Sequence, residues 1–303
     1  MCKGLLGLLA IALLIAGVPF AAGELQKAKP KKIVMMGMNT DHKAGEHEYM
    51  AGLAILEECL KQTPGLEVTV FKVSPNPKKE KGKAWAAGWP AEAKAMEDAD
   101  CVVCFCKTAG DYFMSDGERK EKFQEIMKKG AGFVSLHWAV ETKKEFGDPT
   151  FMAIQGGYYE PGYSTNPHNT ATVKQADPQH PVSRGVKPFE ARDEFYFKLR
   201  FMPEAKPVIT ATLKDYPKFK TDEYPDAPIG WVYVRKDNKG PHGEGRSFGF
   251  TGCHFHKNFA IEDFRRMIVN GILWAAGMEV PPNGAPVMLK APVPDVPDKK
   301  GIN

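Results

Sequence analysis

The chain has 303 residues, of which 43% are hydrophobic and 26% are charged, so it can bury one large core or two small ones. The formal net charge is only +4, and the lysines lie in scattered runs such as Lys78–Lys81 rather than in a basic stripe interleaved with aromatic residues. The composition is therefore that of an ordinary globular protein, and nucleic acid is not expected as a partner.

The first 23 residues have the organisation of a signal peptide. Lys3 precedes an apolar run from Leu5 to Val18 that is short for a bilayer span, and small residues occupy the −3 and −1 positions of a cut after Gly23. We therefore expect residues 1–23 to be removed and residues 24–30 to form a linker. The mature protein is then exported to a bacterial periplasm without stable membrane insertion, and an uncleaved membrane anchor is the alternative.

Strand and helix patterns alternate through the first half of the mature chain. Near-continuous apolar runs predict buried strands at Lys31–Met38, Glu67–Val73, Asp100–Phe105 and Gly132–Ala139. Helical spacing predicts Glu48–Gln62 and a helix from Ser115, as N-cap, to Lys129, whereas the Pro- and Gly-rich stretch Ser74–Pro90 predicts a surface loop. The alternation predicts an α/β fold of three layers, with a mostly parallel sheet flanked by helices as in flavodoxin-like proteins.

The second half predicts shorter strands and one last helix. The strands are Thr170–Lys174, Arg192–Phe197, Val208–Leu213, Gly230–Val234 and Arg246–Phe250. The helix Ile261–Ala276 has Asp263 in its first turn and Gly277 just past its end. From Val280 the chain is rich in proline and ends in lysines, so residues 281–303 are expected to form an exposed extension.

Three of the five cysteines beyond the signal peptide form the pattern Cys101-Val-Val-Cys104-Phe-Cys106. On spacing alone, this pattern resembles a redox or metal motif. However, it lies within an apolar run that predicts a buried parallel strand, where cysteine behaves as a small hydrophobe. We therefore expect core packing rather than a redox role, and an odd number of cysteines predicts no disulfide framework.

Histidines follow several of the predicted strands. His47 lies in the loop after the first strand, and His137 lies near the end of the strand that starts at Gly132. If a strand runs to Cys253, side-chain alternation places His254 and His256 on one face near its end. Because ligands of open α/β sheets bind at the carboxyl ends of the strands, we expect these histidines to meet at one edge of the sheet.

Several motifs occur in an order that resembles the trehalose-utilisation ThuA-like family, which has the class I glutamine amidotransferase-like fold. They are Gly45-Glu-His-Glu-Tyr49, Ser135-Leu-His-Trp-Ala139, Gly156-Gly-Tyr-Tyr-Glu-Pro161, Asn166-Pro-His168, Asp193-Glu-Phe-Tyr196 and Phe248-Gly-Phe-Thr-Gly-Cys-His-Phe-His256. The resemblance covers about residues 31–282 and implies one ThuA-like domain over residues 31–280.

The chain departs from true class I amidotransferases at the positions that carry their chemistry. Those enzymes place a nucleophilic cysteine on a turn after a strand, where this sequence has His137. Their late Gly-x-Gln-Phe-His-Pro-Glu motif keeps its histidine here as His256, while His254 replaces glutamine and Asn258 replaces glutamate. Without a thiolate there is no acyl-enzyme route, so we expect no glutamine hydrolysis.

The resemblance implies a role in disaccharide metabolism, through 3-keto sugars, with a small-molecule sugar as the substrate. An acid–base site beside a keto sugar can remove the acidic proton next to the carbonyl, which leads to elimination or isomerisation; hydrolysis is a further option. The predicted catalytic residues are His137, His256 and Glu194. The predicted substrate-binding residues are Trp138, Tyr158, Tyr159, Asp193 and Asn258.

Converging imidazoles permit two interpretations. They can ligate a divalent metal such as zinc, which takes three protein ligands and keeps a water position open. They can also act without a metal, as general acid and base on a sugar, with Glu194 tuning a histidine. We favour the metal, because clustered histidines without a nucleophile have few other uses. The candidate ligands are His47, His137, His168, His254 and His256.

The competing function is that of a non-catalytic carbohydrate-binding accessory protein. A binding module needs aromatic and amide side chains but not several histidines and a carboxylate pair, so the residue types favour an enzyme. No nicotinamide cofactor is expected, because Gly37-Met-Asn-Thr-Asp41 after the first strand lacks the Gly-x-Gly-x-x-Gly turn. The sugar, the bond that is acted on and the oligomeric state stay open.

Overall fold

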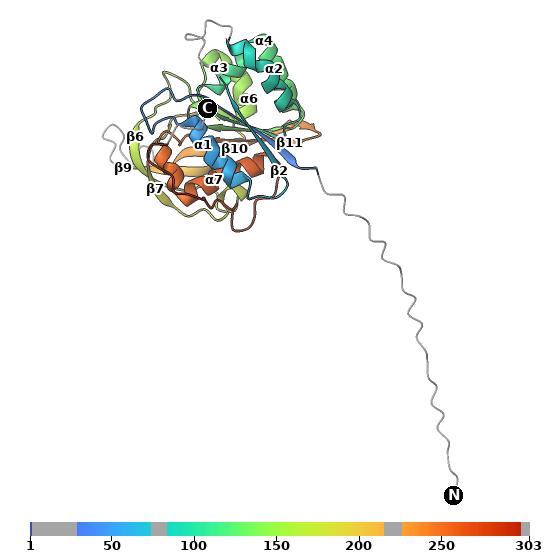
Figure 1. Ribbon diagram of the computed structural model, residues 1–303, viewed down its shortest axis with the longest axis vertical. Helices are drawn as coiled ribbons and strands as arrows, with labels where there is room; N and C mark the ends of the chain where they lie inside the picture. Colours follow the sequence, from blue (N-terminus) through green and yellow to red (C-terminus); the bar gives the residue numbers. More distant parts are fainter. Residues whose placement is uncertain (2–28, 74–83, 215–225, 298–303) are drawn as a thin grey trace.

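The computed structural model describes Met1 and residues 29–73, 84–214 and 226–297, so the predicted signal peptide lies outside the described residues. A nine-stranded mixed sheet runs through the molecule (Figure 1). In sheet order its strands are β2 (Leu66–Lys72), β1 (Lys31–Gly37), β3 (Cys101–Phe105), β4 (Gly132–Leu136), β11 (Gly243–Phe250), β10 (Ala227–Gly240), β9 (Lys206–Lys214), β6 (His168–Gln175) and β7 (Phe189–Glu194). The first five strands are parallel, and the remaining pairs are antiparallel.

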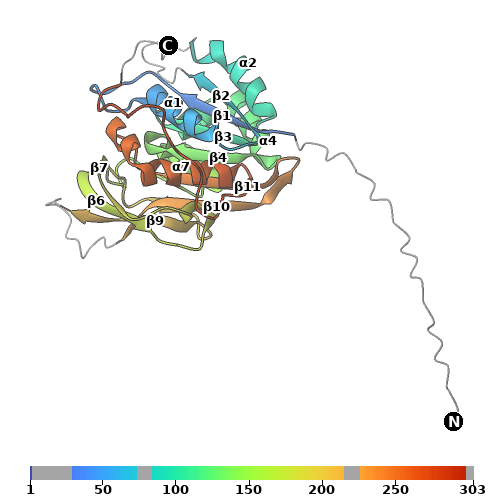
Figure 2. The same cartoon turned by 60° about the horizontal axis from the view of Figure 1, so that its bottom comes forward.

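Helices cover both faces of the sheet, which confirms the expected α/β architecture. One layer holds α1 (Tyr49–Leu60) and α7 (Glu262–Ala275), and the other holds α2 (Ala84–Glu97), α3 (Ala109–Met114), α4 (Gly117–Lys128) and α6 (Met152–Gln155) (Figures 1 and 2). A two-stranded sheet, β5 (Gly157–Tyr158) with β8 (Arg200–Phe201), lies apart from the main one. No helix in the described ranges has both the length and the apolar character to cross a membrane.

Burial explains the two halves of the sheet. Every residue of β3 and β4 is buried, as expected for parallel strands covered by helices on both faces. Strand β6 instead alternates between buried and more exposed residues, because one face of the antiparallel part remains open to solvent. Cys101, Cys104 and Cys106 are buried and unbonded, and burial raises the pKa of Cys101 and Cys104, so they pack as small apolar groups.

Two local predictions were wrong. The Pro- and Gly-containing stretch from Ala84 to Pro90 is helical, as the first half of α2, whereas residues 74–83 lie outside the described chain. Ser115 ends α3 rather than capping α4. The cap of α4 is Asp116, whose carboxylate accepts a hydrogen bond from the Arg119 N–H at 3.0 Å.

The chain after α7 runs along the domain as far as residue 297, with most of its residues exposed and a few buried. Ala285 and Val287 are buried, and the Arg265 guanidinium donates to the Val287 carbonyl at 3.0 and 3.2 Å. A Cβ placed on Gly45 would lie 3.0 Å from the Asp295 carbonyl oxygen. The C-terminal segment therefore ends against the loop that carries His47.

Candidate metal centre

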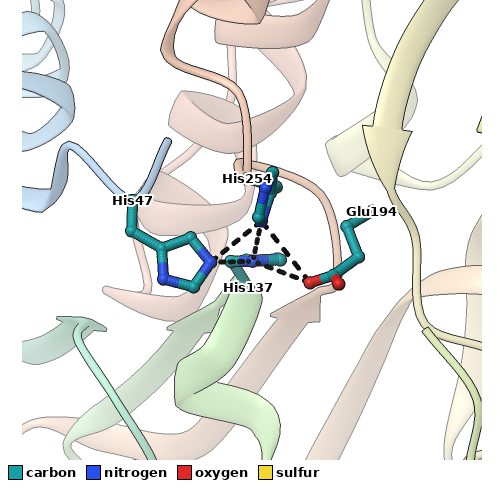
Figure 3. Close-up of side chains that lie close together, drawn as sticks. All are labelled: His47, His137, Glu194 and His254. Atoms are coloured by element: carbon teal, nitrogen blue, oxygen red, sulfur yellow. Dashed lines mark hydrogen bonds and ion pairs between the residues drawn. The ribbon is translucent and has the colours of Figure 1, made fainter. Parts of the chain in front are cut away.

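Three histidines and one glutamate meet at the carboxyl edge of the parallel strands (Figure 3). His137 is the first residue after β4, His47 lies in the loop between β1 and α1, and His254 follows the end of β11. Glu194 is the last residue of β7. We call these four residues the histidine centre. Its three imidazoles are almost completely buried, and the Glu194 side chain is 13% exposed.

Backbone pairing between two loops brings His47 and His254 together. Glu46 forms an antiparallel bridge with Phe255, and the His47 N–H donates to the His254 carbonyl at 2.9 Å. The His256 N–H donates to the Gly45 carbonyl at 2.9 Å. These bonds fix two segments that are about 200 residues apart in the sequence.

The ligand atoms that face one another have the spacing expected around one small cation. His47 Nε2 lies 2.9 Å from His254 Nδ1 and 3.0 Å from His137 Nε2, and the other two nitrogens are 3.3 Å apart. A Glu194 oxygen lies 3.6 Å from the His137 nitrogen and 3.5 Å from the His254 nitrogen. Zinc–nitrogen bonds of 2.0–2.1 Å place tetrahedral ligands roughly 3.3 Å apart, so this set fits such an ion.

The outer hydrogen bonds assign the tautomers of two of these rings. His137 Nδ1 lies 2.8 Å from the Thr251 carbonyl oxygen, which can only accept, so Nδ1 carries the proton. His47 Nδ1 lies 2.9 Å from the Tyr49 hydroxyl and 3.0 Å from an Asp41 carboxylate oxygen; the carboxylate can only accept, which favours a proton on Nδ1 here too. Both Nε2 atoms therefore turn lone pairs toward each other at 3.0 Å. Two facing lone pairs repel unless a cation or a proton lies between them.

Electrostatics keep these rings in the neutral form that binds metals. Burial lowers the pKa of His137 well below its usual value, and the neighbouring His47 and His254 lower it further. Burial also lowers the pKa of His47, against the opposing effect of the Asp41 carboxylate. His137 and His47 are thus held as uncharged imidazoles, the form that binds metals.

The backbone around the centre adopts unusual conformations. His47, His137 and Cys253 have φ angles of 50°, 54° and 97°, in the left-handed region that non-glycine residues rarely enter. Such residues cost about 1–3 kcal/mol each and concentrate at functional sites. Here the strain turns the imidazoles of His47 and His137 toward a common point.

The structure separates His254 from His256. Strand β11 ends at Phe250, and the positive φ of Cys253 breaks the side-chain alternation that would have placed both histidines on one face. His256 begins a short 3-10 helix, and its ring lies 5.8 Å from that of Phe259. It is not one of the four residues whose ligand atoms converge.

Asp193 and Asn258 hold the backbone of the site. Asp193 is fully buried and accepts hydrogen bonds from the N–H groups of Glu194, Cys253 and His254 at 2.8–2.9 Å. The Asn258 amide donates to the same carboxylate at 2.9 Å. Burial raises the pKa of Asp193, and these hydrogen bonds oppose the rise. Both side chains therefore orient the segment that carries His254.

Other predicted residues border the centre through Glu194 or lie apart from it. His168, which is 40% exposed, has Nε2 3.3 Å from a Glu194 oxygen. The hydroxyl of Tyr159 donates to Asn166 at 3.1 Å, and Asn166 donates to Glu194 at 3.0 Å. In contrast, the buried Tyr158 donates to Glu160 at 2.9 Å.

An aromatic wall and a second polar group lie beside His47. The ring of Trp138 lies 5.2 Å from that of His47, with the Lys107 ammonium 4.3 Å from the Trp138 ring centre. Asp41, which sequence reasoning missed, also accepts from His42 Nδ1 at 2.9 Å. The ligand-type residues in the loop after β1 were the signal that could have identified Asp41, since a carboxylate often orients a metal-binding histidine.

The fold and the histidine centre together define a flavodoxin-like α/β protein with a buried ligand set at the carboxyl edge of its sheet. The sequence profile of the ThuA family, described as trehalose utilisation, matches residues 38–275. The chain therefore belongs to the ThuA family, as its motifs predicted.

One solved structure supports this fold. A ThuA-like protein from Bacteroides uniformis superimposes with a TM-score of 0.54 at 17% identity, over 89% of this chain and 99% of that one. A glutamine amidotransferase from Thermotoga maritima gives a TM-score of 0.41 at 10% identity, over 81% of this chain and 98% of that one. No curated protein matches the sequence.

Proposed function

We propose that the chain is an exported, metal-assisted enzyme of sugar metabolism that removes a proton next to the carbonyl of a keto sugar. The observation that carries this proposal is the approach of His47 Nε2 and His137 Nε2 to 3.0 Å in a buried site, where each ring has a hydrogen-bond acceptor at its other nitrogen. The family description of trehalose utilisation supports a disaccharide-derived substrate. The absence of a cysteine at position 137 argues against glutamine hydrolysis.

The residues present fit a divalent cation such as zinc. His47, His137 and His254 would hold it, with Glu194 as a fourth ligand or a hydrogen-bond partner of a bound water. When bound, the cation would supply Lewis-acid stabilisation of charge on a carbonyl oxygen. Trp138 offers an apolar wall for the sugar, and the partly exposed His168 is placed to contact its hydroxyl groups.

A non-catalytic carbohydrate-binding accessory protein is the competing function. Such a protein would gain nothing from left-handed φ angles at two buried histidines, because sugar binding relies on exposed aromatic and amide groups. The strained and desolvated imidazoles therefore favour catalysis.

The deciding experiment measures metal content and turnover in the same preparations. Elemental mass spectrometry is applied to the untagged mature protein and to a His137→Ala, His254→Ala variant. The matched control is His242→Ala, because His242 lies 3.2 Å from Asp100, the residue before β3, at the other end of the sheet. We expect near-stoichiometric metal in the wild type and in His242→Ala, and background levels in the double variant. The 3-keto derivative of trehalose should be turned over by the proteins that contain the metal and not by the double variant.

Two outcomes would count against the proposal. Metal-free wild type with no keto-sugar turnover would leave binding alone as the function, and metal retention by the double variant would move the site elsewhere. Export is tested separately, by N-terminal sequencing of the protein from the periplasmic fraction; a start near residue 24 is expected.

A further inference from the structure

His254 turns a different ring nitrogen into the histidine centre from the other two histidines. Its Nδ1 lies 2.9 Å from His47 Nε2 and 3.3 Å from His137 Nε2. A Glu194 oxygen lies 3.5 Å from the same Nδ1. His47 and His137 instead turn Nε2 inward and have oxygen acceptors at Nδ1. The nitrogen of His254 that points away from the centre is therefore Nε2.

The Nε2 atom of His254 is buried and has no hydrogen-bond partner among the described residues. The residue as a whole is 2% exposed, so bulk water does not replace a protein partner. A neutral imidazole has one donor and one acceptor nitrogen, so a lone pair on Nδ1 requires a proton on Nε2. A buried N–H without an acceptor disfavours that tautomer, which is the one that can bind a metal through Nδ1.

One carboxylate lies close to this nitrogen. A Glu46 oxygen is 3.9 Å from His254 Nε2, and the Glu46 side chain is 21% exposed. This is an ion-pair distance, and a shift of ~1 Å would bring the two atoms to the ~2.9 Å of a hydrogen bond. Within the described part of the chain no hydrogen bond engages the Glu46 carboxylate, so nothing there opposes the shift.

The backbones of both residues are fixed by the pairing of their loops. Glu46 forms the antiparallel bridge with Phe255, and its carbonyl accepts from the Thr40 hydroxyl at 3.0 Å. The His254 N–H donates to Asp193 at 2.9 Å. The closing movement therefore belongs to the Glu46 side chain and not to either loop.

We propose that Glu46 is the positioning residue of His254, because its carboxylate accepts the Nε2 proton and so keeps the lone pair of Nδ1 directed at the histidine centre. The inference rests on the metal site of the proposed function. Glu46 then acts on His254 as Asp41 acts on His47, with an acid at the outer nitrogen of each ring. Without Glu46, the proton of His254 can lie on Nδ1, 2.9 Å from His47 Nε2, where it takes the place of a cation.

The test compares Glu46→Ala and Glu46→Gln with the matched control Asp295→Asn. Asp295 belongs to the C-terminal segment that lies against Gly45, so the control removes one negative charge beside the same loop. Zinc affinity of the mature chain is measured in competition with a chelator of known affinity. We expect Glu46→Ala to weaken it by about 10- to 100-fold, the usual effect of losing a carboxylate that orients a metal-bound histidine. Glu46→Gln should lose less, because its amide oxygen still accepts the proton, and Asp295→Asn should lose nothing.

A second readout reports the tautomer directly. In protein labelled with ¹⁵N-histidine, the ring signals of His254 are identified by their absence from His254→Ala. Their chemical shifts should place the proton on Nε2 in the zinc-bound wild type. In metal-free protein, the proton should remain on Nε2 in the wild type and in Asp295→Asn but move toward Nδ1 in Glu46→Ala. A loop that is merely disturbed would not change the tautomer in this direction.

Each contrary result has a separate meaning. Unchanged zinc affinity in Glu46→Ala would overturn the role of Glu46 and leave the proposed function standing. A proton on Nδ1 of His254 in the zinc-bound wild type would do the same. Weaker affinity with an unchanged tautomer would overturn the positioning role and assign Glu46 to the folding of its loop. Absence of zinc binding by the wild type would overturn both this inference and the proposed metal site.

Discussion

Two clusters of histidine and acid lie at opposite ends of the same parallel strands, and they differ in which atoms face each other. In the amino-edge cluster, Asp100 accepts from the Lys31 ammonium at 2.8 Å and lies 3.2 Å from His242 Nδ1. Its other oxygen accepts from the Lys32 N–H at 2.9 Å. Each close contact there joins nitrogen to oxygen, whereas His47 and His137 join nitrogen to nitrogen at 3.0 Å.

This difference separates a structural ion pair from a candidate ligand set. The amino-edge cluster borders a cavity of about 560 Å³, yet its charges already balance each other. The histidine centre instead brings ring nitrogens face to face, an arrangement that a cation or a shared proton between them would stabilise. A cavity, or a set of residue types, is thus a weaker indication of function than ligand atoms that face one another in a buried site.

Removal of the proposed metal should produce the largest difference between the histidine centre and the amino-edge cluster. A ligand that binds only the folded state stabilises it by about 4 kcal/mol at a free concentration 1,000 times its Kd. We therefore expect a chelator to lower the unfolding midpoint of the wild type by several degrees, and added zinc to restore it. The His137→Ala, His254→Ala variant should show no such dependence, while His242→Ala should behave like the wild type. Equal chelator sensitivity of all three proteins would place the ion outside the histidine centre.

Substitution of Asp41 should have the next largest effect. Its carboxylate lies 3.0 Å from His47 Nδ1, which favours a proton on Nδ1 and a lone pair on Nε2. Loss of such a partner weakens metal affinity by about 10- to 100-fold, so we expect Asp41→Ala to do the same in competition with a chelator of known affinity. Asp100→Asn, which changes the acid of the amino-edge cluster, is the control and should leave the affinity unchanged. Unaltered affinity in Asp41→Ala would show that the carboxylate does not orient His47 and would leave this role to the Tyr49 hydroxyl, 2.9 Å from Nδ1, and to packing.

The sequence predicts the parallel half of the sheet because β3 and β4 are short, continuous apolar runs that only burial on both faces explains. It also places His47 and His137 at one edge, since both follow strands of that half. It cannot distinguish His254 from His256, because the positive φ of Cys253 is set by long-range hydrogen bonds to Asp193. Long-range contacts of this kind leave no local pattern in the chain.

The same limit applies to the residues that support the site. Asp193 was predicted to face the substrate as half of a carboxylate pair with Glu194, yet adjacent strand residues point to opposite faces. Asp193 is buried against backbone N–H groups, and Glu194 reaches the histidines. The first half of α2, Ala84–Pro90, falls within the predicted loop because its proline and glycine outweigh its alanines in the pattern, although alanine favours a helix.

The smallest expected effect concerns acid stability at the amino edge. Burial acts to raise the pKa of Asp100, but the hydrogen bonds from Lys31, Lys32 and His242 outweigh it, and the net pKa is lowered. A lowered carboxyl pKa stabilises the folded state above the unfolded value of about 3.9, and this stabilisation is lost as the pH falls through the folded value. Asp100→Asn should therefore cost about 1 kcal/mol in urea unfolding at pH 7 and much less than that near pH 3. Because both ends of the sheet lose carboxylate charge in acid, the measured quantity is the difference between wild type and variant at each pH. A pH-independent cost would mean that Asp100 acts through packing, and a loss of metal in this variant would mean that the two ends of the sheet are coupled.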